Sequence, residues 1–224
     1  LAAERIGGKK LSKYLKKFGI GQPTGLGFPG ETSGFVPEHQ DWSPTSFPTI
    51  AFGQGLSVNA VQVASVFSTI ANDGLRVEPS LVKKIIHADG SVEEPEAPVT
   101  TRVVSRETAI QVRAMLESVV GEGGTATNAK IPGYRVGGKT GTAQVVDERT
   151  GGYSNQVIAS FVGMVPADNP QLVVAVFISQ PQSGRYGGEL GAPVFKKVSS
   201  YALGALEIPP TGSKAPRLAL TFGG

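Results

Sequence analysis

Three apolar, β-branched segments follow one another in the second half of the chain and constrain its fold most. They span residues 134–146, 157–165 and 172–179. Val, Ile and Thr favour extended backbone, and only Pro166-Ala-Asp-Asn-Pro170 and one further residue separate the second segment from the third. Strands joined by short connections pair in antiparallel fashion. The pattern therefore predicts a meander of three adjacent antiparallel strands.

Helical patterns lie on both sides of these strands. They cover residues 11–18, a stretch from Ser57 or Asn59 to Asn72, residues 105–119 and residues 191–206. Ser105 is a candidate N-cap of the third helix, whose buried side is expected to include Ile110, Leu116 and Val119, with Met115 as a further candidate. A short strand is expected over residues 81–86. Helices first, then a run of strands, then a helix predict an α+β fold with an antiparallel sheet flanked by helices.

Composition excludes several classes of function. The net charge of +3 is too diffuse to indicate nucleic-acid binding, and the five lysines between Lys9 and Lys17 are typical of the solvated face of a short helix. The absence of cysteine excludes disulfides, thiolate metal sites and a cysteine nucleophile. Residues 42–72 carry no charge, but their prolines, glycines and polar residues leave no stretch of about 20 apolar residues that could span a membrane.

One glycine-rich stretch fits a phosphate-binding motif by its letters. Gly133 to Thr140 matches G-x-x-x-x-G-K followed by S or T, in which the backbone cradles phosphates and the next residues run into a helix. Here Gly141 to Val146 follow, and glycine with β-branched residues forms a poor helix start and a good strand. A P-loop nucleotidase is therefore the less favoured interpretation.

The same residues are better interpreted as a strand at the edge of a sheet. Lys139 would then present a cation beside the hydroxyls of Thr140 and Thr142, while Gly141 allows a ligand backbone to approach closely. An exposed edge of this kind can bind an extended peptide by strand addition and hold its carboxylate.

Lys139-Thr140-Gly141 resembles the K-T-G signature of penicillin-binding proteins and serine β-lactamases. Further segments are similar to class B penicillin-binding proteins, most closely to the division-type transpeptidases of actinobacteria. These are Tyr14 to Gly19 with Thr24-Gly25 and Phe28 to Glu31, Phe52 to Gly55 with the helix that ends at Ile70 to Gly74, Gly163 to Asn169, and Gly188 to Phe195. The resemblance implies that residues 1–208 are the C-terminal part of a transpeptidase domain and that residues 209–224 are a tail.

The family's nucleophile motif has no usable counterpart in this sequence. Ser80-Leu-Val-Lys83 fits S-x-x-K only by its letters, because it follows Pro79 at the start of an expected strand rather than opening a helix. No S-x-N precedes Gly19 either. We therefore expect the acylated serine, its lysine base and the S-x-N loop to lie on a preceding segment of the same protein.

The resemblance implies a role for each residue of the K-T-G strand. Lys139 would place its charge near the substrate carboxylate and the proton relay, and Thr140 and Thr142 would donate hydroxyl groups to that carboxylate. The backbone N–H of Thr142 resembles the second oxyanion-hole donor, Gly141 belongs to the substrate-binding strand, and Gln144 would contact substrate further along. Lys139 and Thr142 are thus the candidate catalytic residues.

The resemblance also implies the reaction and its partners. The intact domain would cross-link peptidoglycan stem peptides ending in D-Ala–D-Ala, would be acylated by β-lactams, and would use no metal or organic cofactor and no nucleic acid. It would lie on the extracytoplasmic face of the plasma membrane, anchored by an N-terminal segment outside this stretch, with other cell-division proteins as further candidate partners. A non-catalytic or penicillin-sensing domain of the same fold is the alternative.

Overall fold

The computed structural model describes residues 2–147 and 149–216. Its contacts divide the chain into two compact units. The first comprises residues 1–69 and 75–103, and the second comprises residues 70–74 and 104–224. Each unit is described by itself.

The first unit is mainly helical. Its elements are α1 (Ala2–Ile6), α2 (Gly8–Lys17), the 3-10 helix η1 (His39–Asp41), α3 (Ser46–Ala51) and most of α4 (Ala60–Ala71). Asn59 and Gln62 explain why α4 begins where it does. The Asn59 side chain accepts a hydrogen bond from the Gln62 N–H at 2.8 Å, and the Gln62 side chain accepts one from the Asn59 N–H at 3.0 Å. This reciprocal capping satisfies two free donors of the first turn and confirms the predicted start of the helix.

Short strands complete the first unit. β1 (Leu75–Val77) pairs with β4 (Thr100–Arg102), and β2 (Ile85–Ile86) pairs with β3 (Val92–Glu93), both in antiparallel fashion. The strand expected over residues 81–86 is therefore confined to its last two residues. All residues from 80 to 99 are exposed, so no buried face selects an extended pairing. The Ser80 hydroxyl instead accepts the Val82 N–H at 3.2 Å, a local bond that competes with strand formation.

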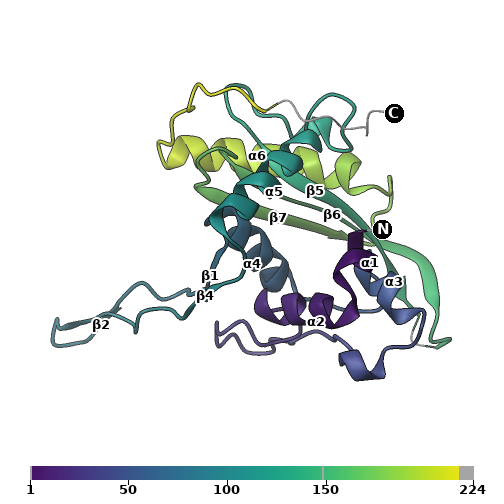
Figure 1. Cartoon of the computed structure of the whole chain (residues 1–224). Coiled ribbons are helices and arrows are strands. Elements are labelled where there is room, and N and C mark those ends of the chain that lie inside the picture. The colour runs from purple at the N-terminus through teal and green to yellow at the C-terminus, as the bar shows by residue number, and fades with distance from the viewer. Residues whose placement is uncertain (1, 148, 217–224) are drawn as a thin grey trace. The chain divides into compact units, whose positions relative to one another are not determined.

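The second unit contains the predicted meander (Figure 1). β5 (Gly137–Val146), β6 (Tyr153–Val165) and β7 (Leu172–Ser179) form one antiparallel sheet in that order. The register pairs Gly137 with Met164 and runs without a shift to Gln144 opposite Val157. Helices α5 (Arg106–Ser118) and α6 (Gly187–Ala205) and the 3-10 helix η2 (Thr127–Ala129) surround the sheet. The predicted α+β class is confirmed.

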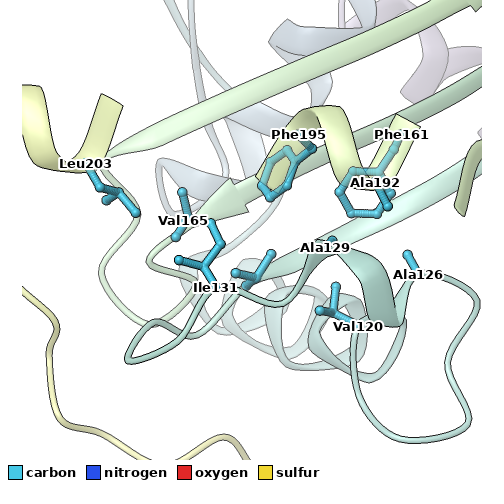
Figure 2. Packing of buried hydrophobic residues seen from close by; sticks show 10 residues of the cluster. Val120, Ala126, Ala129, Ile131, Phe161, Val165, Ala192, Phe195 and Leu203 are labelled. Atoms are coloured by element: carbon cyan, nitrogen blue, oxygen red, sulfur yellow. The ribbon is translucent and has the colours of Figure 1, made fainter. Parts of the chain in front are cut away.

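Helix α6 covers one face of this sheet and closes the main core (Figure 2). The core cluster consists of Val120, Ala126, Ala129, Ile131, Val136, Phe161, Val165, Ala192, Phe195 and Leu203. Phe161 of β6 and Phe195 of α6 are both fully buried, with ring centroids 4.9 Å apart in an edge-to-face arrangement. Helix α5 packs on the other face, where a Cβ on Gly137 would lie 3.3 Å from the Cβ of Leu116.

The start of α5 agrees with the sequence, but its buried face does not. The Ser105 hydroxyl accepts the Thr108 N–H at 3.2 Å, which confirms the predicted N-cap. Ile110 and Met115, by contrast, are 44% and 58% exposed, so their prediction as buried residues is wrong.

Polar residues occupy that face because each of them is paired. The Arg113 guanidinium donates to the Ile70 carbonyl at 3.1 Å, near the end of α4, and to the Asp73 carboxylate at 2.8 Å. The Glu117 carboxylate accepts two hydrogen bonds from Arg135, at 2.6 and 2.8 Å. Burial of charged groups is tolerated when they are paired in this way. A prediction that places only apolar residues on the buried face of α5 therefore fails.

Candidate functional site

The residues of the Lys-Thr-Gly motif lie in β5, at the edge of the described sheet. After Lys139 the chain continues as a strand, paired residue by residue with β6 up to Gln144. A phosphate-binding loop would turn into a helix at this point. The geometry therefore excludes the P-loop interpretation and agrees with the predicted edge strand.

Helix α6 begins against this strand because its first residues are glycines. A Cβ on Gly187 would lie 1.8 Å from the Ser160 carbonyl oxygen, and one on Gly188 would lie 1.9 Å from the Thr125 carbonyl oxygen. Both glycines are buried. Helix α6 therefore includes both glycines and starts four residues earlier than predicted.

A cavity of about 430 Å³ lies where β5, the loop before η2 and the first turn of α6 meet. Thr140 and Thr142 line it, together with Thr125, Thr127, Asn128 and the start of α6. Lys139, Gly141 and Gln144 are not among its lining residues. The structure thus brings together two of the five predicted site residues in one hollow.

The strand's period of two explains this division. Successive side chains of β5 point to opposite faces, so Thr140, Thr142 and Gln144 share one face while Lys139 and Gly141 belong to the other. Gln144 lies beyond the cavity, and its amide nitrogen donates to the Ser154 carbonyl at 3.4 Å.

The Lys139 ammonium nevertheless reaches around the edge of the strand. It donates to the Thr140 carbonyl at 2.9 Å and to the Thr140 hydroxyl at 3.3 Å. A carbonyl that a side chain reaches in this way faces the open edge. In an antiparallel ladder a residue's N–H and C=O point to the same side and alternate along the strand. The N–H of Thr142 is therefore directed to the open edge as well.

Thr125 is one of the residues of this cavity that the sequence did not indicate. Its hydroxyl lies 3.1 Å from the hydroxyl of Thr140, although the two residues are 15 positions apart. Thr125 belongs to a glycine-rich loop whose letters carry no catalytic signature. Only the packing of this loop against α6 and β5 brings it to the site.

Two searches of the described residues bear on function. Over residues 2–147 and 149–216, His, Asp and Glu nowhere gather in groups of three or more that could hold a metal ion. No helix in this part of the chain has the length and apolar character needed to cross a membrane.

An antiparallel sheet covered by helices, with Lys-Thr-Gly on its edge strand, is characteristic of the class of penicillin-binding proteins and serine β-lactamases. The sequence model of the penicillin-binding protein transpeptidase domain matches residues 1–200. The chain belongs to the penicillin-binding protein transpeptidase family.

Individual relatives and solved structures agree with this family. The chain is 39% identical over 98% of its length to penicillin-binding protein PbpB of Mycolicibacterium smegmatis, and 41% identical over 92% to stage V sporulation protein D of Bacillus subtilis. It spans about a third of either protein. Crystallised penicillin-binding protein 3 of Mycobacterium tuberculosis, complexed with ampicillin, is 36% identical with a TM-score of 0.91; the match covers 98% of this chain and 51% of that one.

Proposed function

We propose that residues 1–208 are the C-terminal part of a peptidoglycan D,D-transpeptidase domain, with residues 209–224 as a tail. The observation that carries this proposal is the β5 edge, where two threonine side chains line a cavity and a lysine ammonium lies beside them. The relatives support it, since they include a probable peptidoglycan D,D-transpeptidase of Pseudomonas aeruginosa and a structure with bound ampicillin.

The proposed reaction is acyl transfer through a serine ester. The serine oxygen attacks the carbonyl carbon of the penultimate D-Ala, and the peptide bond to the terminal D-Ala breaks. The terminal D-Ala leaves with a proton on its amine, and an amine of a neighbouring stem peptide then attacks the ester and frees the serine. The serine and its lysine base belong to a preceding segment of the protein. A β-lactam acylates the same serine through its strained amide.

This chain supplies the opposite wall of the cleft. The Lys139 ammonium attracts the substrate carboxylate and favours proton transfer at the serine. Thr140 and Thr142 donate their hydroxyl groups to that carboxylate, and the Thr142 N–H stabilises the oxyanion of the tetrahedral intermediate. Gly141 allows the substrate backbone to approach the strand, and Gln144 contacts substrate beyond the cavity. No metal or organic cofactor takes part in this chemistry.

Cross-linking of peptidoglycan places the protein outside the plasma membrane. We propose that a segment preceding this chain anchors it to the extracytoplasmic face, and that stem peptides and other cell-division proteins are its partners.

A fluorescent penicillin tests this function. It should label the intact protein covalently, and the label should be absent from the isolated 224-residue chain, because that chain lacks the serine. Labelling of the isolated chain would show that the nucleophile lies within these 224 residues and would contradict its proposed position on a preceding segment. Acylation and slow deacylation without cross-linking of stem peptides would instead favour the penicillin-sensing alternative.

A further inference from the structure

We propose that Thr125 is a positioning residue for recognition of the substrate carboxylate. Its hydroxyl donates a hydrogen bond to the Thr140 oxygen and thereby directs the Thr140 proton into the cavity. This inference rests on the proposed function and adds a residue that neither the Lys-Thr-Gly signature nor the strand itself contains.

The loop around Thr125 is held rigidly. The Ala126 N–H donates to the Val119 carbonyl at 2.9 Å, and Ala126 is 1% exposed. On the other side, a Cβ on Gly124 would lie 2.2 Å from the same carbonyl oxygen, and the Thr125 carbonyl packs against Gly188 of α6. With its backbone fixed on both sides, Thr125 keeps its hydroxyl 3.1 Å from that of Thr140.

The hydrogen-bonding capacity of Thr140 explains what this contact does. A hydroxyl group has one proton and two lone pairs. The Lys139 ammonium lies 3.3 Å from the Thr140 oxygen and can only donate, so it uses one lone pair. When Thr125 donates as well, the second lone pair is used and the Thr140 proton is left for a third partner.

That third partner is the bound carboxylate. An ionised carboxylate only accepts hydrogen bonds, so its binding selects the arrangement in which Thr140 donates into the cavity and Thr125 donates to Thr140. In the opposite arrangement Thr140 donates to Thr125 and has no proton of its own left for the ligand. Thr125 therefore stabilises the state in which Thr140 donates to the carboxylate.

The chain offers a control threonine outside the cavity. Thr100 of β4 is exposed as well and is not among the residues that line the cavity. Both threonines are exposed. Replacement of either by valine removes one hydroxyl and preserves the shape of the side chain.

The experiment measures acylation of the intact protein by benzylpenicillin and by its uncharged methyl ester. Because a net hydrogen bond contributes a factor of about 2–10, we expect Thr125→Val to lower the second-order rate constant for the acid by that factor. The ester rate should stay unchanged. Thr125→Ser should restore the acid rate, and Thr100→Val should leave both rates unaltered.

Three outcomes overturn the inference. They are equal rates for Thr125→Val and wild type, an equal loss with acid and ester, and additive effects of Thr125→Val and Thr140→Val when the two are combined. Circular dichroism checks the fold, and Thr125→Ala replaces the valine variant if that variant does not fold. Failure of benzylpenicillin to acylate the wild type would refute the proposed function itself, whereas acylated wild type with an unaffected Thr125→Val refutes only the role of Thr125.

Discussion

The close packing of α6 against the sheet can be tested by a Gly187→Ala substitution, which replaces one hydrogen atom by a methyl group. A methyl group on Gly187 would lie 1.8 Å from the Ser160 carbonyl oxygen and 2.7 Å from the Gly141 carbonyl oxygen. Both neighbours are backbone atoms of paired strands, so neither can rotate away. Gly187→Ala must therefore push the first turn of α6 away from β5.

Overpacking lowers the free energy of unfolding of Gly187→Ala, and the higher helix propensity of alanine offsets part of this loss. Insertion of a methyl group into a tightly packed site costs about 1–3 kcal/mol. Alanine in a helix interior is favoured over glycine by about 0.5–1 kcal/mol, although less at the first position. Because the obstacles are rigid, we expect a net loss of about 0.5–2.5 kcal/mol and a fall in the melting temperature of this domain by about 2–4 °C per kcal/mol.

The same helix contains its control. Gly204 lies near the end of α6, and within residues 2–147 and 149–216 no atom outside the adjoining helical backbone lies within 4 Å of a Cβ placed there. Gly204→Ala should raise the melting temperature slightly, since only helix propensity acts there. In the intact protein, Gly187→Ala should also slow acylation by benzylpenicillin, because the displaced turn lines the cavity with Thr140 and Thr142. A Gly187→Ala protein as stable and as reactive as wild type would refute this reasoning.

Three further predictions concern other parts of the molecule. Lys139→Ala should slow penicillin acylation of the intact protein by about 10²–10⁴-fold with an unchanged melting temperature, and near-wild-type rates would remove its assigned role. Phe195→Ala should cost about 3–5 kcal/mol in urea unfolding, because the ring is fully buried against Phe161, and a loss below 1 kcal/mol would contradict that packing. The hydrogen bond from Arg113, opposed by desolvation, holds the pKa of Asp73 below its usual value, so its stabilisation is present above the unfolded pKa and is lost as the pH falls through the folded one. Asp73→Asn should therefore lower stability at pH 7 and weaken its decline below about pH 4, and unfolding profiles parallel to wild type would disprove the linkage.

The strand meander was predictable because local and global preferences agree there. Residues 172–179 are β-branched and apolar, and the structure forms β7 over the same residues. Ser105 likewise carries its own signal, since a serine before a helical pattern supplies the missing acceptor for the first turn.

Positions decided by tertiary contacts were not predictable in this way. Arg113 and Glu117 occupy the buried face of α5 only because α4 and Arg135 supply partners for their charges. The early start of α6 depends on carbonyl groups of β6 and of the loop before η2, which leave room for glycine alone. No periodicity within either helix contains that information.

The candidate site combines residues that the local sequence predicts with residues that only tertiary contacts bring to it. A sequence motif therefore identifies only part of the site. Lys139, Thr140 and Thr142 lie within one short stretch of the sequence, yet the period of two puts the lysine on the opposite face of the strand. Their proposed joint role depends on the position of β5 at the edge of the described sheet, around which the ammonium can reach. Unpaired edges invite unwanted strand pairing, and a lysine on the edge discourages it. In the proposed function, the open edge offers the Thr142 N–H to an incoming peptide, and the Lys139 charge favours a peptide that ends in a carboxylate over an uncharged strand.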